Sequence, residues 1–350
     1  MRSRLTRLLK VQLPIVLAPF GGLSSTELTA SISAFGGLGS YGLYGYSPDR
    51  IRETITAIRT QTSAPFAVNL WLPTEDEPDT EGTNFDRYAA ALAPFFDELG
   101  LNIPVTPERF LPPFEDQIGA VLELAPPVVS FVYGVPPAEV IAGAHDRGIV
   151  VIGTATTVDE AVALERGGVD AVVATGAEAA GHRVSFLRPA EDSLVGSMAL
   201  IPQVADAVSV PVIAAGGIAD RRGVAAAFAL GAEGVQVGTA FLVTRESAAN
   251  DAHREAIHQT PAHGTVLTRS MSGRLARGAS NRAVRTIETG GVVAPFPMQN
   301  WLTGQFRAEA SRRGLGELQS LWLGQASPLA RFGDAASVFA ELIAGLPVDG

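Results

Sequence analysis

The residues most suited to chemistry lie in GAEAAGHR at 176–183, directly after an apolar run that ends at Thr175. Small side chains let a backbone approach a flat ligand closely. The stretch places one histidine, His182, beside Gly181. A neutral imidazole there could take a proton from a carbon acid or hydrogen-bond an anionic oxygen near neutral pH. We therefore predict that His182 is catalytic; the alternative is a structural histidine, one of five in the chain.

Two glycine-containing turns downstream have the composition of a phosphate cradle. Gly216 and Gly217 lie in AAGGI at 214–218, and Gly238 and Thr239 lie in VQVGTAF at 235–241. Glycine leaves backbone N–H groups free to point at an anion, and barrel enzymes often bind phosphate with the loops after their last two strands. Each turn alone could be a simple tight turn. Together with the histidine motif, they predict a site for a flavin and its phosphate.

Three other groups of polar residues allow more than one interpretation. Asn69 interrupts the apolar run AVNLW, where its amide could bind a flavin or make a buried hydrogen bond. Ser270 and Ser272 are expected to be exposed hydroxyls, and no serine-hydrolase motif accompanies them. Five arginines could form an anion-attracting lid or could hold backbone carbonyls, which we favour: Arg269, Arg274, Arg277, Arg282 and Arg285.

The order of apolar and helical segments predicts the fold. Short β-branched runs alternate with segments of helical period, which is typical of repeated βα units and a parallel sheet. Thr157 and Glu160 are expected to form a capping box at the start of one helix, 157–166. Eight strands are predicted, at 14–18, 37–41, 65–71, 128–133, 149–154, 170–175, 211–215 and 234–238. Eight such units give an α/β fold, the (β/α)₈ TIM barrel, whose active sites lie in the loops after the strands.

Two regions interrupt this rhythm and define the expected domains. Residues 1–245 are predicted to form the barrel, with an insertion at 73–114 that carries a helix near 86–99. Residues 246–318 follow the eighth strand and are expected to form a small capping or substrate domain. Residues 319–350 are expected to return to the barrel as a C-terminal helix.

Composition narrows the class of protein. The chain has 350 residues, 47% hydrophobic and 18% charged, which is enough apolar material for a large core. A net charge of −10 disfavours nucleic-acid binding, and no apolar run suits a membrane span. Cysteine is absent, and His253, His258 and His263 are spaced by five residues, so no metal site is expected. We expect a cytoplasmic protein acting on a small molecule, with its oligomeric state left open.

Several segments, in collinear order over most of the chain, resemble the nitronate monooxygenase family, formerly called 2-nitropropane dioxygenases. They are APFGG at 18–22, PFAVNLWLP at 65–73, VVSFVYGVP at 128–136, GTATTVDEA at 153–161, GAEAAGHR at 176–183, PVIAAGGIAD at 211–220, GAEGVQVGTAFL at 231–242 and TRSMSGRLARG at 268–278. The resemblance implies an FMN-dependent TIM barrel with an extra domain. It also implies oxidation of alkyl nitronates with molecular oxygen and no nicotinamide cofactor.

The resemblance also assigns roles to individual residues. His182 would be the active-site base. Tyr133 stands in a segment where many members carry a histidine, and it is expected with Ser272 to contact substrate. The predicted FMN contacts are Asn69, Thr175, Ala180, Gly181, Gly216, Gly217, Gln236, Gly238 and Thr239. This chain departs from the family at two of them, because Ala180 replaces a usual glycine and Thr175 a common glutamine.

Two other functions remain open at this point. The first is an NAD(P)H-dependent flavin reductase similar to the enoyl-ACP reductases or quinone reductases of the same barrel group. The second is a non-catalytic sensor of a flavin or phosphate ligand, in which a cap signals occupancy. A binding protein has no need for a histidine over the ring, so we favour an enzyme.

Overall fold

A closed barrel of eight parallel strands forms the core of the computed structural model, which describes residues 3–75, 77 and 84–347. The strand order is β1-β9-β8-β6-β5-β4-β3-β2. Backbone bonds of 2.9 Å from Leu38 to Ile15 and from Leu17 to Leu38 close the ring between β1 and β2. The strands are β1 (Ile15–Leu17), β2 (Gly39–Gly42), β3 (Phe66–Trp71), β4 (Val128–Val132), β5 (Val150–Ala155), β6 (Ala171–Thr175), β8 (Val212–Ala215) and β9 (Gly234–Val237). The predicted TIM barrel and its eight strands are confirmed.

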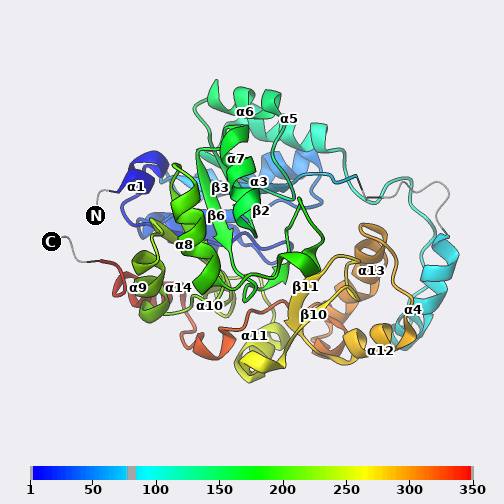
Figure 1. Ribbon diagram of the computed structural model, residues 1–350. Helices are drawn as coiled ribbons and strands as arrows, with labels where there is room; N and C mark the ends of the chain where they lie inside the picture. Colours follow the sequence, from blue (N-terminus) through cyan, green and yellow to red (C-terminus); the bar gives the residue numbers. More distant parts are fainter. Residues whose placement is uncertain (1–2, 76, 78–83, 348–350) are drawn as a thin grey trace.

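Helices surround the barrel, as Figure 1 shows. They are α2 (Thr26–Ala34), α3 (Pro48–Gln61), α5 (Phe114–Leu124), α6 (Ala138–His145), α7 (Val158–Gly167), α8 (Ser197–Ala207), α9 (Arg221–Ala229) and the short α10 (Thr239–Leu242). The N-terminal α1 (Arg4–Leu9) inserts Leu5 and Leu9 among the interior barrel side chains. The C-terminal α14 (Ala335–Ile343) packs on α2 and α9. The barrel interior is therefore filled at the end opposite the loops that follow the strands.

A second layer lies over the carboxyl ends of the strands. It contains α11 (Asp251–Gln259), β10 (Thr265–Thr268), β11 (Ala276–Ala279), α12 (Arg282–Gly290) and α13 (Met298–Arg312). Strand β11 pairs antiparallel both with β10 and with a two-residue strand, β7 (Gly181–His182). His182 lies opposite Ala276, and Gly181 lies opposite Arg277. Strand β7 fixes the loop that carries the histidine. It is absent from the strands predicted from the sequence.

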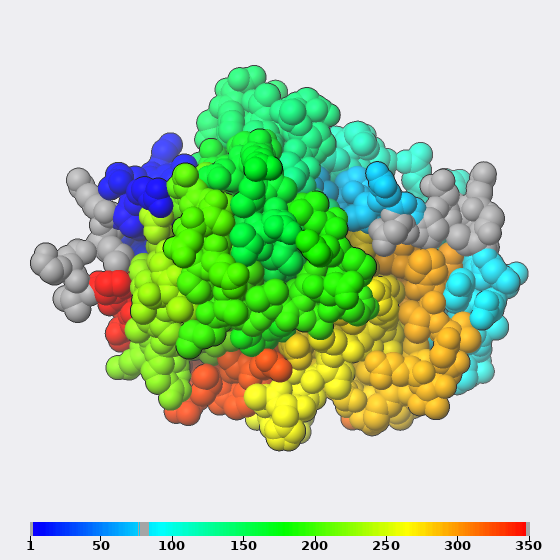
Figure 2. Space-filling model, in the orientation of Figure 1, coloured from blue at the N-terminus to red at the C-terminus, as the bar shows by residue number. Residues whose placement is uncertain are grey.

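The helix expected near 86–99 is present as α4 (Phe85–Leu99), and it packs on α13 and α12. Its Phe95 and Phe96 rings lie 5.0 and 5.8 Å from the Phe306 ring of α13. In Figure 2 its cyan surface adjoins the orange surface of the second layer. Part of the insertion predicted at 73–114 (residues 76 and 78–83) lies outside the described residues. Helix α4, with Leu101 and Phe110 after it, joins the hydrophobic core of the second layer, whereas Phe114 packs on the barrel.

The capping box expected at α7 is only half formed. The Oγ1 of Thr157 accepts the Glu160 N–H at 3.3 Å, as predicted. The Glu160 carboxylate does not return to Thr157: it accepts the N–H and hydroxyl of Thr156 and the N–H groups of Phe186 and Leu187. Glu160 is fully buried and has no contact with water. These four donors therefore take the place of water around its carboxylate. It thereby ties the end of β5 to the chain that follows His182.

We expect Glu160→Gln to destabilise the protein. The Gln amide nitrogen cannot accept a hydrogen bond, so at least one buried N–H group loses its acceptor, at a cost of about 2 kcal/mol. Equilibrium urea unfolding of the purified protein measures the change. Asp159→Asn, at an exposed neighbour on the same helix, is the matched control and should leave the unfolding midpoint unchanged. An unchanged midpoint for Glu160→Gln would contradict this role.

Candidate active site

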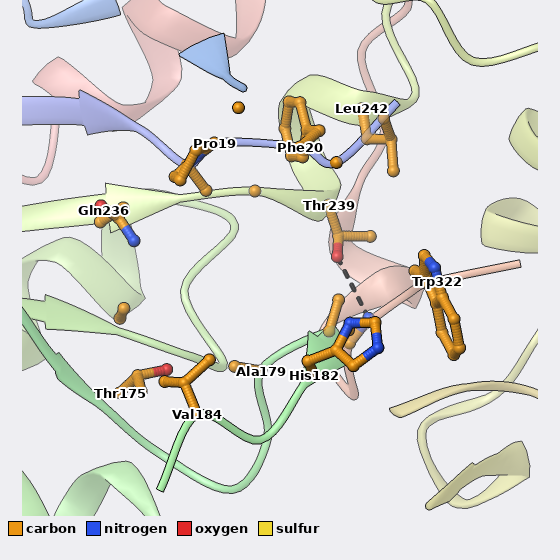
Figure 3. A pocket seen from close by; sticks show the side chains of 18 of the residues that line it. Pro19, Phe20, Thr175, Ala179, His182, Val184, Gln236, Thr239, Leu242 and Trp322 are labelled. Carbon is orange, nitrogen blue, oxygen red and sulfur yellow. Dashed lines mark hydrogen bonds between the residues drawn. The ribbon is translucent and has the colours of Figure 1, made fainter. Parts of the chain in front are cut away.

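A cavity of about 410 Å³ opens at the carboxyl ends of the barrel strands, a size typical of small-molecule sites. Figure 3 shows His182 beside Trp322 on one side of it and Gln236 and Thr175 on another. The predicted residues that line the cavity are Asn69, Thr175, Ala180, Gly181, His182, Gly216, Gly217, Gln236, Gly238 and Thr239. Asn69 lies more than 100 positions before the other residues of this set, and the fold brings all of them to one cavity.

Glycine shapes the cavity wall at the two turns and beside the histidine. Gly216 and Gly217 have φ angles of +93° and +76°, which favour glycine. A side chain on Gly216 would come within 3.0 Å of the Gly176 carbonyl oxygen. Gly181 has a φ of +72°, and an added Cβ there would meet no atom within 4 Å. The wall is therefore bare backbone where a flat or phosphate-bearing ligand would approach.

Asn69 makes a buried hydrogen bond, which was one of the two interpretations of its role, and the flavin contact stays a prediction. Its amide nitrogen donates to the carbonyl and hydroxyl oxygens of Ser130 at 3.2 and 3.0 Å, which is a buried hydrogen bond to the neighbouring strand. The same side chain lines the cavity. Because Ser130 binds the amide nitrogen, it fixes the orientation of the Asn69 side chain at the cavity.

Glu178 and Arg183 hold the chain on either side of the histidine motif. Glu178 accepts the backbone N–H of Ser197 at 3.0 Å and its hydroxyl at 2.9 Å, so it caps α8. Arg183 is buried and donates to the carbonyl oxygens of Gly176 and Thr175 at 2.8 and 3.1 Å. Burial lowers the pKa of Arg183 to about 10, so it remains charged. These contacts fix the loop from which His182 projects.

His182 is oriented by a hydrogen bond to the second layer. Its Nε2 lies 2.8 Å from the Oγ of Ser272, and that hydroxyl also lies 3.1 Å from the Arg274 carbonyl oxygen, to which it donates. Because the Ser272 hydroxyl gives its one proton to the Arg274 carbonyl, it can only accept from His182. Nε2 of His182 therefore carries the ring proton, and Nδ1 keeps its lone pair. The indole rings of Trp71 and Trp322 lie 4.9 and 5.4 Å from the imidazole.

The electrostatic environment keeps His182 neutral. Burial, together with the charges of Arg274 and Arg307, lowers the pKa of His182 to about 3. Near neutral pH the imidazole therefore carries a single ring proton, on Nε2, and its other nitrogen is able to accept one. An anion placed beside it would be favoured by the same cationic surroundings.

Tyr133 and Ser272 lie behind the cavity wall. Neither is among the residues that line it. The centroids of the Tyr133 and Trp71 rings lie 5.1 Å apart. The guanidinium carbon of Arg274 lies over the Tyr133 ring, 4.2 Å from the centroid of that ring. The expectation that Ser270 and Ser272 are exposed is wrong, because each is 1% exposed. Their segment is a buried turn between β10 and β11 within the second layer and not a free loop.

The arginine-rich segment mostly holds the backbone. Arg277 donates to the Ala177 carbonyl oxygen at 2.9 Å, and Arg285 to that of Ser280 at 2.6 Å. None of the five arginines lines the cavity. The arginine that does is Arg307 on α13, accompanied by Asn300. Sequence reasoning missed both residues, because helical periodicity on α13 does not reveal which face meets a distant barrel.

Comparison with known proteins identifies the family. A family model for nitronate monooxygenase matches residues 2–346. The chain belongs to the nitronate monooxygenase family. A probable nitronate monooxygenase of Staphylococcus aureus is 39% identical over 344 residues, which cover 98% of this chain and 96% of the relative. Membership of this family makes the protein an oxidoreductase.

Solved structures of similar proteins agree with this family. A nitroalkane oxidase from Streptomyces ansochromogenes superposes with a TM-score of 0.87 at 35% identity, covering 98% of this chain and 97% of that one. FabK from Thermotoga maritima gives 0.76 at 30% identity, with coverage of 98% and 95%. Among the described residues, no helix is long and apolar enough to cross a membrane. In the same part of the chain, no three His, Cys, Asp or Glu side chains cluster as metal ligands.

The depressed pKa of His182 predicts a pH dependence of stability. An unfolded chain gains a proton on this histidine near pH 6.5, whereas the folded protein gains it near pH 3. The contribution of neutral His182 is therefore complete above about pH 6.5 and is lost as the pH falls toward 3, at roughly 1.4 kcal/mol per pH unit.

Urea unfolding between pH 7 and pH 4 tests this dependence. As the pH falls, the free energy of unfolding of His182→Gln should decrease less steeply than that of the wild type. The difference in slope should be about 1.4 kcal/mol per pH unit, which corresponds to one proton. Exposed His263 supplies the matched variant, His263→Gln, which should follow the wild type. Equal slopes for His182→Gln and the wild type would show that His182 is not buried in its neutral form.

Proposed function

We propose that the protein is an FMN-dependent oxidoreductase that oxidises alkyl nitronates, and nitroalkanes after deprotonation, with molecular oxygen. The observation that supports this most directly is a neutral histidine, held by Ser272, at a cavity with a glycine wall and cationic surroundings. A substrate that carries or develops a negative charge beside an electron-accepting ring suits that arrangement. Family membership supports the same reaction class.

The cavity fits FMN at the positions where the fold leaves backbone bare. Gly216, Gly217, Gly238 and Thr239 would hold the phosphate. Asn69, Thr175, Ala180, Gly181 and Gln236 would contact the rest of the cofactor, as proposed from the resemblance. FMN, when bound, supplies the redox chemistry with oxygen that no side chain in the cavity can provide.

The residues of this chain would control the proton and the placement of the substrate. Nδ1 of His182 would accept the α-proton of a neutral nitroalkane, while Nε2–H stays on Ser272. The anion formed beside the imidazole would offset the charges of Arg274 and Arg307, and it would thereby raise the low pKa of His182 as the proton arrives. Ser272 and Tyr133 would then act on the substrate through their contacts with His182 and Trp71. In this proposal, the barrel of residues 1–245 binds the cofactor, residues 246–318 cap the substrate, and residues 319–350 return to the barrel.

An NAD(P)H-dependent flavin reductase is the second candidate. The similarity to FabK over nearly the whole chain favours it, although with lower identity and TM-score than the nitroalkane oxidase. Such an enzyme would use the same barrel and a different electron donor.

Oxygen uptake by the FMN-loaded protein distinguishes the two functions. We expect rapid uptake with propionate 3-nitronate and none with NADH alone. Anaerobic bleaching of the flavin by NADH, with an inert nitronate, would assign the protein to the reductases instead.

We expect His182→Ala to retain FMN and to lose turnover of neutral nitroalkanes by roughly 100-fold or more, because the proton acceptor is gone. Preformed nitronates need no deprotonation, so their kcat/KM should fall much less. Parallel assays with nitroethane and ethyl nitronate give this ratio, and the flavin absorbance gives cofactor content. Equal losses on both substrates would remove the general-base role from His182.

A further inference from the structure

Arg307 presents a positive charge to the cavity, and among the described residues it has no carboxylate partner. It lies on α13 and lines the same cavity as His182. In the described part of the chain no acidic group pairs with it, whereas Arg312 and Arg313 on the same helix both pair with Glu309 at 2.6 Å. Burial lowers the pKa of Arg307 to about 10, so the guanidinium stays charged at neutral pH.

The donors of Arg307 are only partly used by the protein. Its Nη2 donates to the backbone and side-chain oxygens of Asn300 at 3.0 and 2.8 Å, and its Nη1 donates to the Ser320 hydroxyl at 2.6 Å. The Nε–H is buried and has no acceptor. The three hydrogen bonds replace part of the lost hydration, but none of these acceptors carries a negative charge. The desolvated positive charge is therefore best compensated by an anion that binds beside it.

Asn300 fixes the guanidinium on the wall that carries His182. Its Oδ1 accepts from Arg307, and its Nδ2 donates to the Tyr44 hydroxyl at 3.0 Å. The Tyr44 ring packs 4.3 Å from Trp71, whose ring lies 4.9 Å from His182. A continuous chain of contacts thus joins the cation to the histidine. Tyr44 follows β2 and Trp71 ends β3, whereas the glycine turns follow β8 and β9.

Arg274 does not offer the same charge to a ligand. It is bonded to Glu77 at 2.8 Å and lies over the rings of Tyr133 and Phe296. It does not line the cavity. Of the two arginines that depress the pKa of His182, Arg307 is the one whose charge borders the ligand space.

We propose that Arg307, oriented by Asn300, binds the planar anionic head group of the substrate and so determines a preference for preformed nitronates over neutral nitroalkanes. This inference rests on the proposed function for the identity of the anion. A guanidinium matches two oxygens on one planar centre better than a point charge does. The neutral nitroalkane carries no net charge and gains far less from this contact until its proton has left.

Arg307→Gln tests the specificity. We expect kcat/KM for ethyl nitronate to fall roughly 100-fold, mainly through KM, while kcat/KM for nitroethane falls several-fold at most. Arg307→Lys keeps the charge without the planar fork and should recover part of the loss. Arg312→Gln, at the paired arginine one turn along α13, is the matched control and should behave as wild type. Equal losses on nitronate and nitroalkane, or full activity of Arg307→Gln on nitronate, would overturn the proposal.

Anion binding provides a readout that does not require turnover. Nitrate is planar and anionic like the nitronate group, and its Kd can be measured from perturbation of the flavin absorbance of the FMN-loaded protein. We expect the Kd to rise at least 10-fold in Arg307→Gln and to remain unchanged in Arg312→Gln. Loss of FMN from Arg307→Gln and Arg307→Lys would instead assign Arg307 to the cofactor. A further outcome is a wild type that binds nitrate through Arg307 and yet fails to oxidise nitronates. That result would reject the proposed function and retain the anion site.

Discussion

The antiparallel pairing of Gly181–His182 with Ala276–Arg277 is the constraint on which the cavity depends. A histidine on a glycine-rich loop would otherwise sample many orientations, because small residues restrict the backbone little. Pairing with β11 fixes its main chain, and Ser272, in the turn before β11, fixes its ring. The same strand carries Arg277, whose guanidinium holds the Ala177 carbonyl on the histidine loop. Barrel and second layer are thus joined at the residue proposed to move the proton.

The barrel was predictable because its signals are local. Each strand is a short β-branched run, and Gly216, Gly217 and His182 stand directly after such runs, where barrel enzymes place their sites. The resemblance to a known family added the expected ligand. What failed, or was missed, depends on tertiary contacts. Two residues of β7 carry no periodicity, and Ser272 looked exposed because its partner lies 90 residues away.

Glu160 shows how a correct local signal can conceal a longer-range role. The sequence pattern at Thr157 predicted the helix start, and the Thr157 hydroxyl does cap it. The carboxylate, however, accepts from Thr156 on one oxygen and, on the other, from the N–H groups of Phe186 and Leu187, which the chain brings within reach only after folding. Unused N–H groups compete for a buried carboxylate, and the tertiary donors prevail over the local one.

In the proposed function, the barrel binds the cofactor and the second layer contacts the substrate. The glycine turns after β8 and β9 and Asn69 on β3 belong to the barrel, whereas Ser272, Asn300 and Arg307 come from the second layer. A change of substrate would then require no change in the strands proposed to position the cofactor, since loops and caps vary on a constant barrel. Among the described residues, no carboxylate of the second layer pairs with Arg307, whose side chain borders the cavity. Such a charge opposes folding unless an anion accompanies it, so its presence at the cavity is better explained by binding than by stability.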